Sequence, residues 1–201
     1  MGQDNQKSTP QKIPPPAKAQ NFSWPDIRTQ SQFQQAADVQ QSGGKIYPEQ
    51  GKKIGEILKA MRVIDDKILH AVEMRHQTKK AKDKPTGELL VYMGIIEPEV
   101  LTRALCIQSG VLMVDVQSIH IPFEILKYVS NEIAREKRAI PVHVYHGTLY
   151  LAVADPLNFS EQHFFAFSTG LKIKPVFAPD SQIDESINSK WVALDSEKWA
   201  G

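Results

Sequence analysis

The stretch Lys53-Ile54-Gly55-Glu56-Ile57-Leu58 is matched 32 positions later by Pro85-Thr86-Gly87-Glu88-Leu89-Leu90, and this duplication decides the fold of the centre of the chain. The same offset aligns Met61 with Met93, Ile64 with Ile96 and Leu69 with Leu101. Apolar residues recur at helical spacing within each copy, and neither copy could bury its apolar face alone. The sequence therefore predicts two helix–turn–helix units that pack on each other.

Turn and cap residues divide each copy into two helices. In the first copy, Asp65-Asp66 can cap the second helix, which should fade through the polar run at 77–84 and stop before Pro85. In the second copy, Gly94 breaks the short first helix and Pro98 opens the next one, which Gly110 ends. We expect the same two-helix architecture twice.

The remainder of the chain alternates between the two kinds of secondary structure. Strands are expected over residues 111–114, 139–145, 148–153 and 171–177, and helices over 123–129, 131–137, 160–168 and 180–190. His146-Gly147 has the right chemistry for a hairpin turn, and Asp155-Pro156 for a turn after a strand. The predicted fold class is α+β, with a helical tandem-repeat subdomain followed by a small mixed α/β subdomain.

These patterns divide the chain into four parts. Residues 1–50 are rich in Gln, Ser, Lys and Pro, and they are predicted to be a disordered tail because they offer little apolar surface to bury. Residues 51–110 form the duplicated helical subdomain and residues 111–190 the α+β subdomain. Residues 191–201 are expected to be a C-terminal tail, although Trp191 and Trp199 are unusual in so polar an ending.

Charge and cysteine content restrict the classes of partner. The 24 Lys and Arg residues balance 23 Asp and Glu residues, so no overall field draws the chain to nucleic acid. The run Lys79–Lys84 leaves nucleic-acid binding open as an alternative to a solvated loop. The single Cys106 lies in an apolar run, where a buried hydrophobe is the favoured interpretation. The N-terminus has no apolar signal segment, and no stretch has the roughly 20 apolar residues of a membrane span. We expect a cytoplasmic chain that reaches a membrane only through a partner.

Catalytic and metal-binding motifs are not found in this sequence. It contains no Walker A motif, no nucleophile elbow, and no histidine and carboxylate spacing typical of a zinc site. The sequence therefore predicts a protein that is not an enzyme and has no cofactor or metal.

Three motifs together carry a resemblance to a known family. They are the run from Gly87 to Gln108, the run Ala139-Ile140-Pro141-Val142, and the run Leu149–Pro156, which ends in Ala-Asp-Pro. Their order resembles the N-terminal domain of type II secretion and type IV pilus assembly ATPases, called the MshEN or GspE N-terminal domain. The resemblance covers residues 51–190 without the ATPase domain, which leaves open whether the chain is free-standing or a fragment of a larger ATPase.

The resemblance implies a regulatory or docking module. Its expected partner is a secretion or pilus motor ATPase, or an inner-membrane platform protein. The alternative that the resemblance implies is a cyclic di-GMP receptor, in which each repeat opens with Arg-Leu-Gly and later carries a Gly, two Leu and a closing Gln. The candidate ligand-binding residues are the positions that fit this pattern: Lys53, Ile54, Gly55, Leu58, Leu69, Gly87, Leu90, Gly94, Leu101, Leu105 and Gln108.

Departures from the family pattern weigh on the cyclic di-GMP alternative. Pro85 stands where the second repeat should have Arg. Lys53 lacks the planar guanidinium with which Arg can hydrogen-bond to guanine and stack on it. In the first repeat, Arg62 replaces the Gly, Glu73 the second Leu and His76 the Gln. A buried Glu73 facing a dianionic ligand would repel it. The repeats are thus expected to serve mainly as a packed surface for protein contact.

Overall fold

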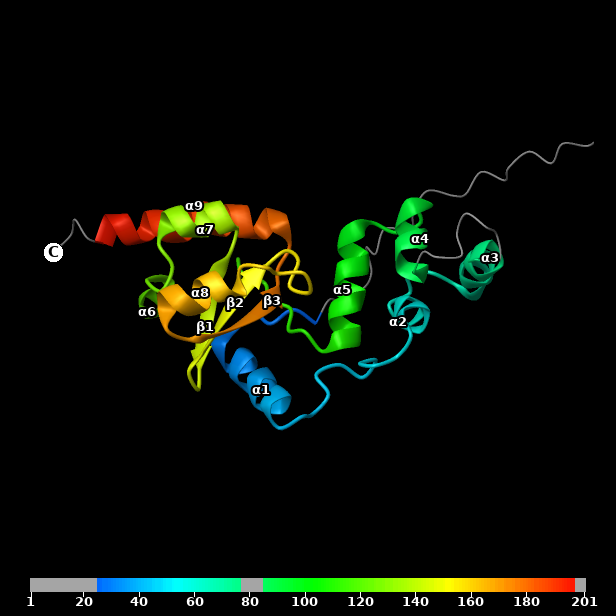
Figure 1. The fold of residues 1–201 in the computed structure, drawn as a ribbon, viewed down its shortest axis with the longest axis horizontal. Helices are drawn as coiled ribbons and strands as arrows, with labels where there is room; N and C mark the ends of the chain where they lie inside the picture. Colours follow the sequence, from blue (N-terminus) through cyan, green and yellow to red (C-terminus); the bar gives the residue numbers. More distant parts are fainter. Residues whose placement is uncertain (1–24, 77–84, 198–201) are drawn as a thin grey trace, which may run out of the picture.

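The chain folds into two packed units, a helical unit and an α/β unit (Figure 1). The computed structural model describes residues 25–76 and 85–197. In the helical unit, the first repeat is α2 (Ile54–Ala60) with α3 (Asp66–His76), and the second is α4 (Thr86–Tyr92) with α5 (Pro98–Ser109). In both repeats the helices begin at positions that differ by the offset seen in the sequence. The predicted duplication is therefore a structural one.

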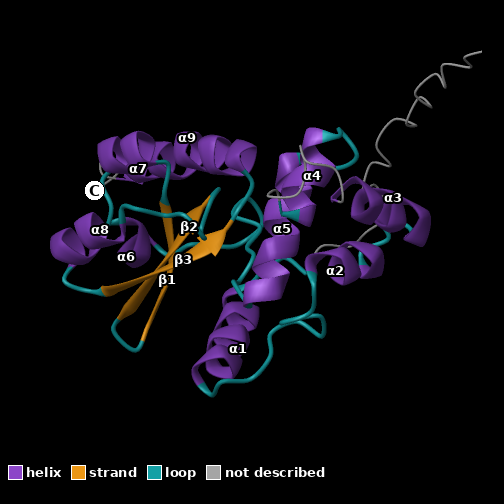
Figure 2. Cartoon of the chain, turned by 45° about the vertical axis from the view of Figure 1, so that its right-hand side comes forward, coloured by secondary structure: helices purple, strands orange, loops and turns teal. Residues whose placement is uncertain are grey.

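The α/β unit is built on a three-stranded sheet with the order β1-β2-β3. Strands β1 (Ile140–Tyr145) and β2 (Thr148–Val153) are antiparallel, and His146 and Gly147, both at positive φ, form the two-residue turn between them. Strand β3 (Lys172–Phe177) runs parallel to β2, after the crossover helix α8 (Gln162–Thr169). The short α6 (Phe123–Leu126) packs near β1, and α7 (Asn131–Lys137) lies beside α9 (Asp180–Glu197) (Figures 1 and 2).

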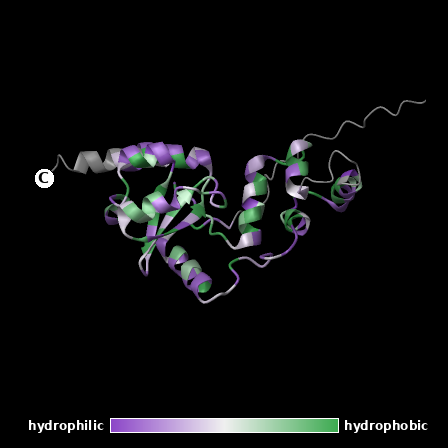
Figure 3. Cartoon of the chain, in the orientation of Figure 1, coloured by the Kyte–Doolittle hydropathy of each residue, from purple (hydrophilic) through white to green (hydrophobic). Residues whose placement is uncertain are grey.

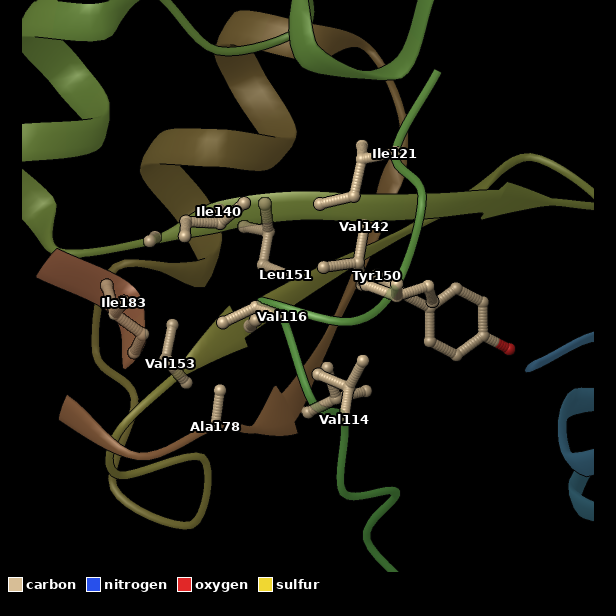
Figure 4. Packing of buried hydrophobic residues seen from close by; sticks show 14 of the residues in the cluster. Val114, Val116, Ile121, Ile140, Val142, Tyr150, Leu151, Val153, Ala178 and Ile183 are labelled. Atoms are coloured by element: carbon tan, nitrogen blue, oxygen red, sulfur yellow. The ribbon is translucent and has the colours of Figure 1, made fainter. Parts of the chain in front are cut away.

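Apolar side chains from the sheet and its surroundings form the core of this unit. Figure 4 shows Ile140, Val142, Leu151 and Val153 packed with Val116, Ile121 and Ile183. The hydropathy colouring of Figure 3 shows the same division, with largely hydrophobic strands and an outer helix α9 that is mostly hydrophilic. A second core fills the helical unit, and Met113 and Phe177 belong to it although they come from the α/β unit. The two units therefore share a packed junction.

The predicted disordered tail over residues 1–50 is wrong for residues 30–41, which form helix α1 (Gln30–Gln41). Thr29 caps this helix and forms a capping box with Gln32, and Phe33 and Ala37 are completely buried. Composition did not predict α1 because the helix is mostly polar and buries only two side chains, Phe33 and Ala37. Residues 1–24 of the predicted tail lie outside the described residues.

Two other predicted boundaries also change. The strand expected over residues 111–114 is reduced to single bridges: Met113 pairs with Phe177, and Val114 with Ile27. The backbone of Ile27 and Val114 thus extends the edge of the sheet beyond β3, through the bonds Val114 N–Phe177 O and Ile27 N–Met113 O, both 2.8 Å. The C-terminal tail expected from residue 191 is helical to Glu197, because Trp191 is 6% exposed and packs in the α/β core.

The other helices and turns lie where the sequence predicts them. Gly110 ends α5 in the left-handed conformation, and the Asp65 carboxylate accepts a hydrogen bond from the Ile68 backbone at the start of α3. Among the described residues, no helix combines the length and apolar character that a membrane crossing requires.

Candidate functional site

Each helical repeat closes through a glycine that lies directly under a leucine. Gly55 and Gly87 are buried in the first turn of α2 and α4. A Cβ atom at Gly87 would stand 2.3 Å from Leu101 Cδ1, and one at Gly55 would stand 2.8 Å from Leu69 Cδ1. The two repeats therefore make the same close helix–helix contact, which explains why both copies keep Gly at this position and Leu fourteen residues later.

The turn between the two helices is also the same in both repeats. Arg62 and Gly94 occupy the equivalent position, with φ of 57° and 68°. After each turn a backbone N–H donates a hydrogen bond to a carbonyl of the first helix. Val63 N donates to Leu58 O and Ile95 N donates to Leu90 O, each at 3.0 Å. The replacement of Gly by Arg62 keeps the turn but puts a side chain in a backbone conformation that favours glycine.

This difference gives a matched pair of stability predictions. Arg62→Gly should raise the free energy of unfolding by about 0.5–1 kcal/mol, because it relieves the left-handed strain at an exposed position. Gly94→Ala should lower it by about 1–2 kcal/mol, because no atom lies within 4 Å of the added Cβ and backbone strain is the only cost. Urea denaturation measures both. Changes of the same sign in the two variants would contradict the equivalence of the turns.

The predicted ligand-binding residues divide into buried and accessible sets. Leu58 and Leu90 are completely buried, so the structure places them in the core between the repeats and not at a surface. Lys53 and Gly94 are exposed, and the remaining apolar positions are half-buried, namely Ile54, Leu69, Leu101 and Leu105. The structure therefore brings the predicted ligand-binding residues together in the packed pair of repeats, where Lys53 and Gly94 are the exposed members of the set.

The repeats contact each other reciprocally. Helix α2 packs on α5 and α4 packs on α3, so the first helix of each repeat contacts the second helix of the other. Gln108, the closing residue of the second repeat, reaches the opening of the first, where its Nε2 donates to Lys52 O at 2.8 Å. The Gly51 backbone N–H donates to Gln108 O at 3.0 Å. Gln108 thus has a structural partner in this conformation.

The departures from the family pattern have different structural consequences. Pro85 and Lys53 precede their helices with nearly the same backbone angles, so Pro85 preserves the helix start without supplying a polar side chain. Glu73 is exposed, which corrects the expectation that a buried carboxylate would repel a ligand there. The side chain of His76 lies outside the described residues, as does the Lys79–Lys84 run proposed for nucleic-acid contact.

A buried ionic cluster, which the sequence analysis missed, joins the two units. Arg103 of α5 is 4% exposed; its Nη1 donates to Asp26 Oδ1 at 2.8 Å and its Nε to Glu99 Oε1 at 2.9 Å. The guanidinium also lies over the Phe177 ring, 4.9 Å from its centroid. Burial raises the pKa of Asp26, and the attraction of Arg103 offsets this only in part. We call this set of contacts the Arg103 clamp.

The outer face of α8 carries unusually exposed aromatic residues. Phe165 points into the core and is completely buried, whereas Phe167 is 94% exposed and Phe164 is 38% exposed. Phe164 and Phe167 are three residues apart and therefore share a helix face. Lys137 Nζ lies 5.3 Å from the centroid of the Phe164 ring and makes an ion pair with Glu161 at 3.5 Å. We call Phe164 and Phe167 the α8 aromatic face.

Cys106 and Asp155 have structural roles. Burial raises the pKa of the Cys106 thiol to about 12, in agreement with its predicted role as a buried hydrophobe. Asp155 accepts hydrogen bonds from the backbone and side chain of Asn158, as expected of a turn residue. Within residues 25–76 and 85–197, no three His, Cys, Asp or Glu side chains gather as a metal site would require.

The geometry defines a two-unit α+β module with a duplicated helical half and an exposed aromatic face. Residues 109–189, which make up most of the α/β unit, match the model of the MshEN domain family. The family model thus confirms the resemblance for this part of the chain. The match begins after Gln108, so it includes none of the predicted ligand-binding residues.

Known proteins of two kinds resemble the chain. The type IV pilus assembly ATPase PilB of Myxococcus xanthus (strain DK1622) is 29% identical over 135 residues, which cover 67% of this chain and 23% of that protein. The chain therefore spans about a quarter of the length of this relative. A structure of MshE with cyclic di-GMP has a TM-score of 0.48 at 20% identity and covers 68% of this chain and 97% of that one. A structure of the N-terminal domain of XpsE has a TM-score of 0.42 at 22% identity, and the match covers 68% of this chain and 92% of that one.

Proposed function

We propose that this chain is a non-enzymatic docking module of a type II secretion or type IV pilus-like system. It binds a motor ATPase or an inner-membrane platform protein from the cytoplasmic side, and reaches the membrane through that partner. The MshEN domain and the similarity to a pilus assembly ATPase support the choice of machine. The single observation that carries the docking function is the α8 aromatic face, where Phe167 is 94% exposed within the MshEN domain itself.

The α8 aromatic face fits a contact surface better than a folding role. Phe165 already supplies the burial that holds α8 on the sheet, so Phe167 contributes little to the core. Exposed aromatic residues are enriched where proteins bind one another, because they bury a large area with little loss of side-chain freedom. The neighbouring Lys137–Glu161 pair supplies a polar border. A partner would therefore cover Phe164 and Phe167 with an apolar surface.

Co-purification from the native host tests the proposal. The tagged chain should recover a motor ATPase or a platform protein of a secretion or pilus system, identified by mass spectrometry. Phe167→Asp should abolish that recovery, whereas Met74→Ser, a change at a 53% exposed residue of α3, should leave it intact. Recovery of no such component under gentle conditions would overturn the proposal.

The alternative function is binding of cyclic di-GMP by the helical repeats. It is favoured by the reciprocal contacts of the repeats and by the left-handed turn that both copies preserve, since a two-fold symmetric dinucleotide suits two equivalent half-sites. Against it, Pro85 offers no donor where guanine would be bound in the second copy.

Calorimetric titration distinguishes the two functions. If docking is the sole function, the wild-type chain should give no heat of binding at about 100 μM cyclic di-GMP. The cyclic di-GMP alternative predicts saturable heat, strengthened at least tenfold by Pro85→Arg, which restores the guanidinium of the family pattern. Saturable heat with the wild-type chain would establish the alternative without excluding docking.

A further inference from the structure

His143 of β1 lies at the centre of the contact that holds α1 on the α/β unit. Its ring centroid is 5.0 Å from that of Phe33, which α1 inserts, and 6.3 Å from that of Tyr150 on β2. The ring of Tyr145, which is also on β1, stacks on the His143 ring with 6.2 Å between the centroids. Phe33 and Tyr150 also meet edge to face at 5.0 Å. The histidine is therefore one member of an aromatic cluster that α1 completes.

Hydrogen bonds fix which nitrogen of His143 carries the proton. Gln30 Nε2 donates to two backbone carbonyls, His120 O at 2.8 Å and Val142 O at 3.1 Å. Because this end of the Gln30 side chain must be the amide nitrogen, its Oε1 can only accept. His143 Nδ1, which lies 2.7 Å from Oε1, must therefore be the donor. The neutral imidazole carries its hydrogen on Nδ1, and Nε2 is left as the unprotonated atom.

His143 Nε2 is buried and makes no hydrogen bond with any residue that the structure describes. Protonation would occur at this atom, and would create a buried N–H and a positive charge with no acceptor. Burial accordingly lowers the pKa of His143, and no neighbouring charge contributes to the shift. The docked α1 therefore favours the neutral ring over the charged one.

The charged and titratable groups around the cluster do not compensate for this charge. From α1, the Asp38 carboxylate accepts a hydrogen bond from the Tyr145 hydroxyl and is occupied there. From β2, Tyr150 is buried, and burial raises the pKa of its hydroxyl. From β3, Lys174 Nζ lies 5.9 Å from the Tyr150 centroid and adds positive charge. His120 is exposed, and its backbone carbonyl accepts the hydrogen bond from Gln30.

We propose that His143 is a proton-sensitive latch for α1: protonation of its ring releases residues 25–41 from the α/β unit. Lifting α1 removes Phe33 from the ring and lets water reach Nε2, so the released state titrates like an ordinary histidine. The same segment carries Ile27, which extends the sheet edge, and Asp26, which completes the Arg103 clamp. Release of α1 therefore also loosens the junction between the two units.

The direction of the pH dependence follows from the lowered pKa. Above pH 6.5, the ordinary value for histidine, the ring is neutral in both states and docking of α1 does not depend on pH. As the pH falls below 6.5, the released state binds a proton that the docked state does not. The docking equilibrium weakens until the pH passes the lower pKa of the docked state, and is constant below it.

Hydrogen exchange of the α1 amides, corrected for the intrinsic pH dependence of exchange, tests the latch between pH 7.5 and 5. The wild-type protection factors of α1 should fall severalfold over this range, because the released state binds a proton that the docked state disfavours. His143→Asn keeps a donor for Gln30 but cannot be protonated, and its protection should not change with pH. The matched control is His70→Asn, a change at an exposed histidine of α3 in the helical unit, and it should behave like the wild type.

Two results would overturn the latch. One is wild-type protection that is flat over this range, and the other is an equal fall in His143→Asn. If His143→Asn does not fold, an NMR titration of the wild-type imidazole decides the question: a pKa clearly below 6.5 supports the latch, and one at or above 6.5 contradicts it.

Discussion

Replacement of Arg103 by Met should lower the free energy of unfolding by about 3–5 kcal/mol, because it leaves the Asp26 carboxylate buried without its partner. The side chains of the pair are only 5% and 10% exposed, so solvent cannot replace the lost hydrogen bond. The contact over Phe177 would be lost as well. Urea denaturation measures the change.

Two further variants separate the ionic from the packing contribution of the Arg103 clamp. Arg28→Met removes a 63% exposed guanidinium that lies 3.5 Å from Asp115, and should change the stability by less than about 1 kcal/mol. Combining Arg103→Met with Asp26→Leu removes both charges and should recover most of the loss. Additive destabilisation in this double variant would show that the pair is not the source of the effect.

Leu58→Ala and Leu90→Ala should each lower the free energy of unfolding by about 2–5 kcal/mol, and by similar amounts. Both side chains are completely buried at equivalent positions of the two repeats, and they share one core. Thermal and urea denaturation measure the two variants beside Glu88→Ala, an exposed change in α4 that should alter stability by less than about 0.5 kcal/mol. A loss confined to one repeat would show that the duplication is not energetically shared.

The helical repeats could be predicted from the sequence because their determinants are local. The Gly–Leu contacts, the turn residues and the helix caps all lie within one copy, and the second copy repeats them at a fixed offset. The same holds for the β1–β2 hairpin, where His146-Gly147 sets the turn. The offset could not show which of the repeated leucines are exposed. Leu58 and Leu90 are both buried in the core that the two repeats share.

Features that depend on distant partners were missed for a physical reason. Helix α1 is mostly glutamine and polar residues, and its position depends on Phe33 meeting His143 and Tyr150 more than a hundred residues later. The Arg103 clamp joins residues 77 positions apart. On α8, the sequence shows three Phe residues without indicating that Phe165 is covered and Phe167 is not.

We propose that this chain docks on a component of a secretion or pilus machine through the α8 aromatic face. Equilibrium binding between the purified chain and the cytoplasmic part of the component recovered from the host measures this contact. We predict saturable binding that Phe167→Asp weakens at least tenfold, about 1.4 kcal/mol, and that Met74→Ser leaves unchanged. Binding that Phe167→Asp does not weaken, or the absence of binding by the wild-type chain, would show that the chain does not dock through the α8 aromatic face.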